Sequence, residues 1–552
     1  MKKFYNFLAI VFLSILSHNV HSQSPGDIAF TAINVDGDED FAFVLLTNLS
    51  NGTEIYFTEN NWTGSAFSGT GEGQIKWTAG SDAYAGTIVV VNNISTGSPT
   101  VSNGTLSNKA GSWGLSSSNE GLYALSAAPA TSYGSAPTFY ASIHTDFSGS
   151  ETISGTGLVS GTSSIDFDND TDGVFFTGTR NGQTSMSDYK TAINNTSNWN
   201  DIGNGDGETH FSSFSTDPFG SSITWDGSDS TTWTAAANWN LNRPSNLNDN
   251  VTIVESDDFQ PTILSDVTVN NFTVSSGDVL IHQNASLTVN GNFSNSGTVE
   301  LRSNKTSYSS LVISGTSSGN IEYRRFINTV GSGEWDLVGS AVSGQSIAGV
   351  VNQSEIATNG SSPTTYALGT YSNAGSPGTW TNVTSNDTSG NLVSGKGYQM
   401  ATDSGQRVDF TGTIVNSNTS VSITSPGSGT KWNLVANPFP SYVNGNSNAG
   451  TNNFFSTNSG VLHDSFTAVY GWDADGSGYT AYNAANTWYI APGQGFFVAS
   501  ANASGSSVSF NLNMRTVTGT GSFVQDSVQD EVEIGLYNGD SRLDYTKLFF
   551  IP

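Results

Sequence analysis

Residues 335–339 read WDLVG, and residues 432–436 read WNLVA. Each of these words is followed, at nearly the same spacing, by a second related word: GKGY at 395–398 and GQGF at 493–496. Because matched words recur in the same order, the sequence predicts one unit of roughly 100 residues that is used twice. A unit of that length is one small domain, whereas the repeats that build a solenoid are shorter.

The duplicated words are typical of β-strands. In the second copy, Trp432, Leu434 and Ala436 would lie on one face of a strand, because side chains alternate between the two faces. Short β-favouring runs separated by Gly, Ser and Asn predict antiparallel pairing. Two sheets packed face to face are the simplest way to bury the apolar faces of such strands. Each unit is therefore predicted to be a β-sandwich.

The two β-sandwich repeats are expected to span residues 322–426 and 427–520, where a third pair of words, VDF and VSF, closes each copy. Trp335 and Trp432 should occupy equivalent buried positions, because they take the same place in the matched words. Truncating Trp432 to alanine should then cost what the loss of a core aromatic costs, about 3–5 kcal/mol.

The middle of each repeat holds aromatic residues in a Gly, Ser and Asn background: Tyr366, Tyr371 and Trp380, then Tyr470, Trp472 and Tyr479. One interpretation is a platform on which sugar rings stack. The other is packing in the core and across strands, which we favour because aromatic residues dominate the cores of small β domains.

Composition limits the classes of function. The 552 residues contain 17 Lys and Arg against 46 Asp and Glu, which gives a net charge of −29. Such a chain does not neutralise nucleic-acid phosphates, and anionic membrane surfaces repel it. With 61 glycines and a hydrophobic content of 36%, the composition indicates a loop-rich all-β protein that has enough apolar residues for several cores. The sequence has no cysteine, which excludes disulfides and thiolate chemistry.

Residues 1–22 are predicted to be a signal peptide. They have a basic start, and their apolar run at 7–16 is too short to span a bilayer. Cleavage is expected near Ser22 and Gln23, and no later stretch approaches the length of a transmembrane helix. Export without any cysteine suggests a bacterial route, so we expect a secreted or cell-surface bacterial protein.

The domain that follows is expected at residues 23–218. Residues 27–30, 41–46 and 53–57 are short apolar or alternating runs typical of strands. Residues 86–91 are apolar on both faces, which predicts a strand in the interior of a sheet. Together these runs predict a β-sandwich-like domain.

Residues 219–321 are predicted to hold a tryptophan-rich linker or cap and a short parallel β-solenoid. Val269 and Val289 are 20 residues apart, and so are Val279 and Val299. A 20-residue period of short β runs with Asn and Gly corners is typical of a parallel solenoid. About three coils are expected, with these valines pointing inward and stacking coil upon coil. The tryptophan-rich segment before them would cap the open end.

Several words resemble those of multi-domain exported surface proteins of Bacteroidota-type bacteria, which implies the cell surface or the medium of a Gram-negative bacterium. GDIAF at 26–30 and IYFTEN at 55–60 resemble an uncharacterised N-terminal domain of the lamin-tail type, which implies an Ig-like β fold and says nothing about activity. WNLVANPFP at 432–440 is similar to the tandem β region that precedes the sorting domain in type IX secretion cargo. Residues 521–552 are expected to begin a further β domain. Because no C-terminal sorting domain follows, we expect the chain to be a fragment.

A search for catalytic motifs finds none in the sequence. The pattern GTSSG at 315–319 matches a nucleophile elbow, but no helix is expected after it. Pairs of carboxylates that cleave glycosides need no local motif, and Glu54, Glu59, Glu72 and Glu120 are available for one. Surface solvation explains those residues better. We therefore expect no catalytic site and no organic cofactor.

One constellation predicts a weak metal site. The motif DxDxDG supplies Asp168, Asp170 and Asp172, with Asp166 just before it and the carbonyl of Val174 just after. Oxygen ligands at this spacing form the first half of a calcium loop, and its glycine permits the sharp turn. The glutamate that completes such a loop is absent, so the dissociation constant for Ca²⁺ should be on the order of 10⁻⁴–10⁻³ M. The alternative is an empty Asx-rich turn.

These features predict an exported structural or adhesion protein, built as a rod of β modules, with no catalytic site in this chain. Its partners would be a polysaccharide or another surface protein. The alternative is a polysaccharide-binding accessory module, or the non-catalytic part of a secreted hydrolase. A third possibility is an enzyme whose catalytic domain lies outside these residues.

Overall fold

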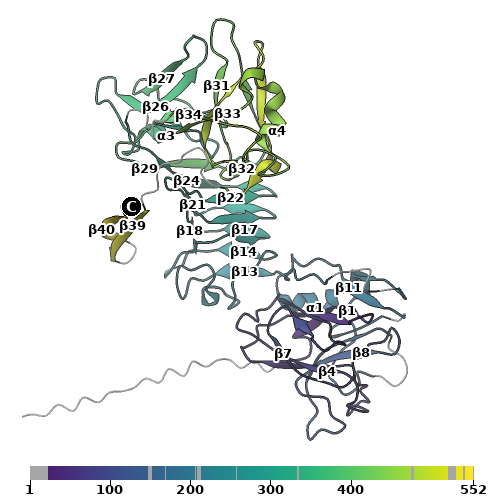
Figure 1. Ribbon diagram of the computed structural model, residues 1–552. Coiled ribbons are helices and arrows are strands. Elements are labelled where there is room, and N and C mark those ends of the chain that lie inside the picture. Colours follow the sequence, from purple (N-terminus) through teal and green to yellow (C-terminus); the bar gives the residue numbers. More distant parts are fainter. Residues whose placement is uncertain are drawn as a thin grey trace, which may run out of the picture. The chain divides into compact units, whose positions relative to one another are not determined.

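The computed structural model describes residues 23–146, 152–167, 170–205, 207, 213–256, 258–331, 335–473, 478–519, 530–538 and 541–550. The chain divides into two compact units, residues 1–221 and 222–552, and strands dominate both of them (Figure 1). The predicted signal peptide, residues 1–22, lies outside the described residues. Among those that are described, no helix is long and apolar enough to cross a membrane.

The first unit is a sandwich of two six-stranded sheets. Its strands are β1 (Ile28–Asn34), β2 (Asp40–Leu45), β3 (Glu54–Thr58), β4 (Gln74–Thr78), β5 (Ile88–Asn92), β6 (Thr100–Val101), β7 (Thr105–Ala110), β8 (Gly121–Leu125), β9 (Phe139–His144), β10 (Ser164–Asp166), β11 (Gly173–Phe176) and β12 (Trp199–Asp201). One sheet has the order β12-β11-β1-β2-β5-β6, and the other has the order β10-β9-β8-β3-β4-β7. The predicted β-sandwich is therefore confirmed.

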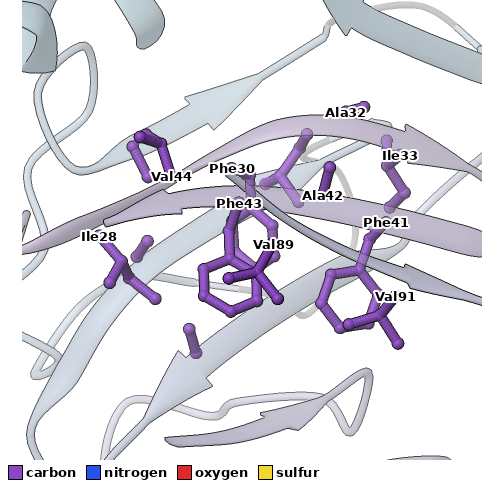
Figure 2. Packing of buried hydrophobic residues seen from close by; sticks show 14 of the residues in the cluster. Ile28, Phe30, Ala32, Ile33, Phe41, Ala42, Phe43, Val44, Val89 and Val91 are labelled. Carbon is purple, nitrogen blue, oxygen red and sulfur yellow. The ribbon is translucent and has the colours of Figure 1, made fainter. Parts of the chain in front are cut away.

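Aromatic side chains fill the core of this sandwich. Phe41 and Phe43 on β2 lie 4.8 and 4.9 Å from the ring of Phe57 on β3, so they join the two sheets. Figure 2 shows Phe41 and Phe43 beside Val89 and Val91 of β5. As expected, β5 is buried on both faces, although only the two-residue strand β6 separates it from the sheet edge. The helix α1 (Tyr189–Ile193) packs against β1.

The second unit begins with a parallel β-solenoid. Its strands are β13 (Ser222–Trp225), β14 (Asn250–Ile253), β15 (Thr262–Ile263), β16 (Val267–Val269), β17 (Asn271–Val274), β18 (Asp278–Ile281), β19 (Ser286–Val289), β20 (Phe293–Asn295), β21 (Thr298–Arg302), β22 (Ser310–Ile313), β23 (Ser317–Ser318) and β24 (Asn320–Ile327). They form three faces: β13-β14-β17-β20-β23, β15-β18-β21-β24 and β16-β19-β22. Figure 1 shows β13, β14 and β17 stacked one above the other. The longest face stacks five strands, so the expectation of about three coils was too short.

The solenoid register follows the period seen in the sequence. Val269 pairs with Val289, and Val279 pairs with Val299, each pair in parallel strands. All four side chains are buried, which confirms that they point inward and stack. The identical side chains align because parallel strands of successive coils place the same position of the repeat directly above itself.

The tryptophan-rich segment forms the first coil of the solenoid and is more than a linker. Trp225, Trp233 and Trp239 are buried, with ring centroids 4.8 to 6.2 Å apart. Trp233 stacks on Phe272, which in turn stacks on Phe293 of the next coil. The aromatic column thus fills the core where the solenoid starts.

The rest of the unit contains two equivalent four-stranded sheets. The first is built from β25 (Asp336–Val338), β26 (Thr365–Ser372), β27 (Thr379–Thr384) and β28 (Tyr398–Met400), and the second from β31 (Trp432–Ala436), β33 (Val469–Asp473), β34 (Gly478–Tyr482) and β36 (Gly495–Ala499). Their orders are β25-β28-β26-β27 and β31-β36-β33-β34. Each order runs first strand, last strand, then the hairpin, so the duplication predicted from the sequence extends to the topology.

An additional antiparallel pair accompanies each four-stranded sheet. These strands are β29 (Gln406–Thr413), which pairs with β24, and β30 (Thr419–Ile423), which pairs with β37 (Ser506–Phe510). Since β24 also belongs to the solenoid, the first repeat is continuous with it. Strand β30 comes before residue 427, yet it pairs inside the second repeat.

The other helices and strands of this unit include five short ones: α3 (Ile347–Val351), α4 (Phe454–Asn458), β32 (Tyr442–Asn444), β35 (Tyr489–Ile490) and β38 (Arg515–Thr516). Two longer strands follow them, β39 (Asp530–Asn538) and β40 (Ser541–Phe550). Strands β39 and β40 pair as an antiparallel hairpin in the region where a further β domain was expected.

Candidate functional site

The two repeats of the second unit join through reciprocal contacts. The N–H of Gly339 donates to the carbonyl of Gly493 at 2.9 Å, and the N–H of Ala436 donates to the carbonyl of Gly395 at 2.7 Å. Gly339 and Ala436 take the same place in the repeat, and so do Gly395 and Gly493. Each repeat therefore gives the other the contact that it receives, as subunits do in a two-fold symmetric dimer.

The contacts at this junction explain why both G-x-G words need glycine. Gly395 and Gly493 have φ angles of 79° and 60°, a region that non-glycine residues rarely adopt. A β-carbon on Gly495 would lie 2.6 Å from the carbonyl carbon of Leu337 in the other repeat. A β-carbon on Gly397 would likewise collide with the side chain of Leu434. The first glycine of each word permits the turn, and the second permits the close approach of the two sheets.

An aromatic pocket of about 430 Å³ lies where the two sheets meet, and it is lined by Tyr371, Trp380, Trp432, Phe466, Tyr470, Tyr479 and Phe497. We call it the aromatic cleft. Two of its rings come from the first repeat and five from the second. Every described residue that lines it is aromatic, and none of them carries a formal charge at neutral pH. An open pocket with such a lining suits a ligand that offers flat apolar faces.

Equivalent hairpins supply the rims of the aromatic cleft. Tyr371 on β26 pairs across the strands with Trp380 on β27, and Trp472 on β33 pairs with Tyr479 on β34. The ring centroids lie 5.2 Å apart in the first pair and 4.7 Å apart in the second. The outer member of each pair stays open to solvent, because Trp380 is 37% exposed and Tyr479 is 51% exposed.

Phe497 connects the two rims. It lies on β36, and its ring is 4.9 Å from Tyr371, 6.1 Å from Trp380 and 5.6 Å from Tyr479. These contacts are edge-to-face, an arrangement that stabilises aromatic clusters. Phe497 is itself buried, so it forms the base against which the exposed rings are held.

Trp335 and Trp432 occupy equivalent positions, but the prediction that both are buried was wrong. Both are half-buried. Trp432 lines the aromatic cleft, with its ring 5.3 Å from Phe466 and 4.8 Å from Tyr470. Trp335 instead packs beside three alanines of its own repeat. Trp432 is less buried than predicted because it lines the aromatic cleft, and the repeated words do not reveal that cleft.

Two tyrosines of the aromatic cleft, Tyr470 and Tyr479, keep their protons at neutral pH. Burial and the neighbouring Tyr371 together raise the pKa of Tyr479 to about 12, and burial is the larger cause. Burial also raises the pKa of Tyr470. The hydroxyls of Tyr371 and Thr430 lie 3.2 Å apart. The cleft therefore offers neutral hydroxyl groups as well as ring faces.

The aromatic residues named from the sequence are thus only partly explained by packing. Tyr371, Trp380, Tyr470 and Tyr479 line the aromatic cleft, where they form cross-strand or edge-to-face contacts and also face solvent. Sequence reasoning missed Phe466, which lies in a short 3₁₀ turn outside the matched words. It also missed Phe497, although the word GQGF that precedes it marked this strand.

The structure places the predicted calcium ligands at the ends of two strands of the first unit. Asp166 ends β10 and is half-buried, Asp170 is exposed, and Asp172 comes directly before β11. Val174 is buried inside β11, which lies between β1 and β12. Asp168 lies outside the described residues. Calcium binding here stays a prediction from the sequence.

The environment of Asp172 is acidic. Burial raises the pKa of Asp172, and the carboxylates of Asp36 and Asp170 raise it further, while the hydroxyl of Ser117 lowers it. Within the described part of the chain, no group of three or more His, Asp or Glu side chains is placed to hold a metal ion.

The part of the chain that holds the aromatic cleft matches one family of known proteins. A family described as a domain of unknown function (DUF8693) matches residues 224–542, from the first solenoid coil to the last hairpin. No curated protein and no solved structure matches the chain.

Proposed function

Because the chain belongs to the DUF8693 family, whose description states no function, we propose a function from the site itself: binding of a neutral polysaccharide in the aromatic cleft by an exported, non-catalytic adhesion protein. The observation that carries this proposal is the cleft of seven aromatic rings, whose outermost members Trp380 and Tyr479 are open to solvent. The solenoid would act as a supporting rod. The first unit would act as a further surface module.

Sugar rings suit this lining for a physical reason. One face of a pyranose ring presents several C–H groups, which are weakly positive and apolar. The face of an aromatic ring is electron-rich, so the two surfaces attract each other while both lose water. Exposed aromatic side chains are also stiff, so that ordering them on binding costs little entropy.

Charge favours a neutral ligand over an acidic one. None of the seven lining side chains is a cation, and the chain as a whole carries a net charge of −29. The ammonium group of Lys431 lies 5.0 Å from the ring centroid of Phe466, beside the cleft. An acidic polysaccharide would therefore be repelled at long range and would find no cation among the lining side chains themselves. The lining also lacks the pair of carboxylates that glycoside hydrolysis needs, which supports binding without cleavage.

The proposal is tested by calorimetry of the exported chain with xylan, a β-glucan and a galactomannan, and with alginate as the acidic comparison. We expect at least one neutral polysaccharide to bind and alginate not to bind. Trp380→Ala should weaken that binding about 30-fold, which corresponds to about 2 kcal/mol for an aromatic hot spot of binding. Its melting temperature should change little, because Trp380 is already 37% exposed.

A matched control is Phe259→Ala. Phe259 is an aromatic residue of similar exposure, 40%, and it lies between β14 and β15 of the solenoid. This substitution should leave polysaccharide binding unchanged. The proposal fails if none of the neutral polysaccharides binds, or if Trp380→Ala and Phe259→Ala have the same effect.

A further inference from the structure

The two repeats share a backbone but differ in side chains next to the aromatic cleft. In the second repeat, Tyr470 pairs with both Phe497 and Ala481 across neighbouring strands. The place of Tyr470 is taken in the first repeat by Gly369. One wall of the cleft is therefore aromatic at a place where the other wall has no side chain.

Two amide side chains occupy this place in the first repeat. Gly369 pairs with Asn382 on β27 and with Gln399 on β28. The Nε2 group of Gln399 donates a hydrogen bond to Oδ1 of Asn382 at 2.7 Å. A β-carbon at position 369 would collide with both amides, so glycine is the residue that leaves room for the pair. We call these two side chains the amide pair.

The amide pair faces the same way as the rim of the aromatic cleft. Asn382 is two residues after Trp380 on β27, and Gly369 is two residues before Tyr371 on β26. Side chains two apart on a strand share one face, about 7 Å apart. Gln399 also pairs with Leu337, which packs in a cluster with Phe497 of the second repeat. The amide pair thus continues the first-repeat wall of the cleft.

The pair keeps one donor and one acceptor for a ligand. Asn382 and Gln399 are half-buried. In the regions that the structure describes, the Nδ2 group of Asn382 and the Oε1 atom of Gln399 have no hydrogen-bond partner in the protein. A donor beside an acceptor matches two neighbouring hydroxyl groups of one sugar, each of which can both donate and accept.

We infer that Asn382 and Gln399, with the room left by Gly369, form a specificity-determining subsite that binds neighbouring hydroxyls of one sugar while an adjacent sugar stacks on Trp380. This inference rests on the proposed function and names its ligand more narrowly. The ligand is a neutral polysaccharide with free vicinal hydroxyls on consecutive residues. Stacking tolerates many sugars, whereas the amide pair discriminates among them by hydrogen bonding.

The test compares each neutral polysaccharide that binds with its O-methylated form, which keeps the ring faces but loses hydroxyl donors. The exported wild-type chain should bind the unmethylated form about tenfold more tightly, as expected for the loss of one or two hydrogen bonds. Gln399→Met and Asn382→Leu keep the side-chain volume and remove the amide. Both should abolish that preference and still bind the methylated form.

Two further variants separate the subsite from the aromatic cleft. Trp380→Ala should weaken binding of both forms by the same factor and keep their ratio. Thr381→Val is a matched control, because Thr381 lies on the same strand and points to its other face. It should change neither affinity nor ratio. Melting temperatures measured by circular dichroism would show that each variant is folded.

The outcomes distinguish this inference from the proposed function. If the wild type binds and Trp380→Ala weakens binding, but Gln399→Met and Asn382→Leu keep the wild-type ratio, the amide subsite is wrong and the cleft stands. If the wild type binds the two forms equally, the subsite is also wrong. If no neutral polysaccharide binds at all, both the function and the subsite fall.

Discussion

Two buried glutamates in the first unit show how single residues couple this fold to pH. Glu39 is 7% exposed and Glu59 is 2% exposed. Burial, with a smaller contribution from the charges of neighbouring carboxylates, raises the pKa of each to about 7. The side chain of Glu59 accepts hydrogen bonds from the N–H groups of Gly73 and Gly114, which lowers its pKa in part. Glu59 thus ties two loops together, a structural role.

We predict that the stability of the first unit falls as pH rises from about 5 to 8. The folded state holds the protons of Glu39 and Glu59 more tightly than the unfolded state, whose pKa is near 4.5. Their contribution is full below the unfolded value and is lost as pH rises through about 7. Melting temperatures recorded across this pH range would check the prediction.

Two variants locate the source of this pH dependence. Glu59→Gln can still accept hydrogen bonds from both N–H groups, so it should flatten the slope of melting temperature against pH. Asp82→Asn is the control, because it removes one carboxylate from an exposed turn of the first unit, and Asp82 is not among the groups that shift the pKa of Glu39 or Glu59. An unchanged slope in Glu59→Gln would contradict the assignment.

Two tryptophans of the second repeat should differ in their effect on stability. Trp488 is 1% exposed, and its Nε1–H donates to the carbonyl of Asn483 at 2.7 Å. We predict that Trp488→Ala lowers the free energy of unfolding by about 3–5 kcal/mol, the effect of losing a core aromatic. Trp432→Ala should cost less, because Trp432 is half-buried on the wall of the cleft. Urea unfolding would measure both, and equal losses would contradict the structure.

At the scale of elements, the strands that could be predicted from the sequence are those that belong to a repeated pattern. The solenoid register was readable because Val279 stacks on Val299 and so recurs at a fixed spacing. The first coil was missed because a long segment separates β13 from β14 and hides the period. Repetition also predicted the shared strand order of the two sheets, since matched words must fold alike.

The aromatic cleft could not be predicted in this way. Matched words define each repeat but not how the two repeats meet, which depends on reciprocal backbone contacts such as that between Gly339 and Gly493. Phe466 joins the lining from a turn outside any matched word. The amide pair depends on positions where the repeats differ, and a search for similarity passes over such positions.

At the scale of the whole molecule, the duplicated sequence supplies both walls of the aromatic cleft. The second-unit sheets keep the same topology, while their facing side chains have diverged into an aromatic wall and a wall with an amide pair. The match to the DUF8693 family covers the solenoid and both sheets together. This organisation supports our proposal that the rod carries a binding site between its repeats.

The measurement that tests this proposal most directly is a crystal structure of the chain with an oligosaccharide cut from the neutral polysaccharide that binds best. We predict that one sugar ring stacks on Trp380 inside the aromatic cleft, with Tyr479 on the opposite rim. The next sugar should lie within hydrogen-bond distance of Asn382 or Gln399. An oligosaccharide bound elsewhere on the chain, with the cleft empty, would contradict the proposal.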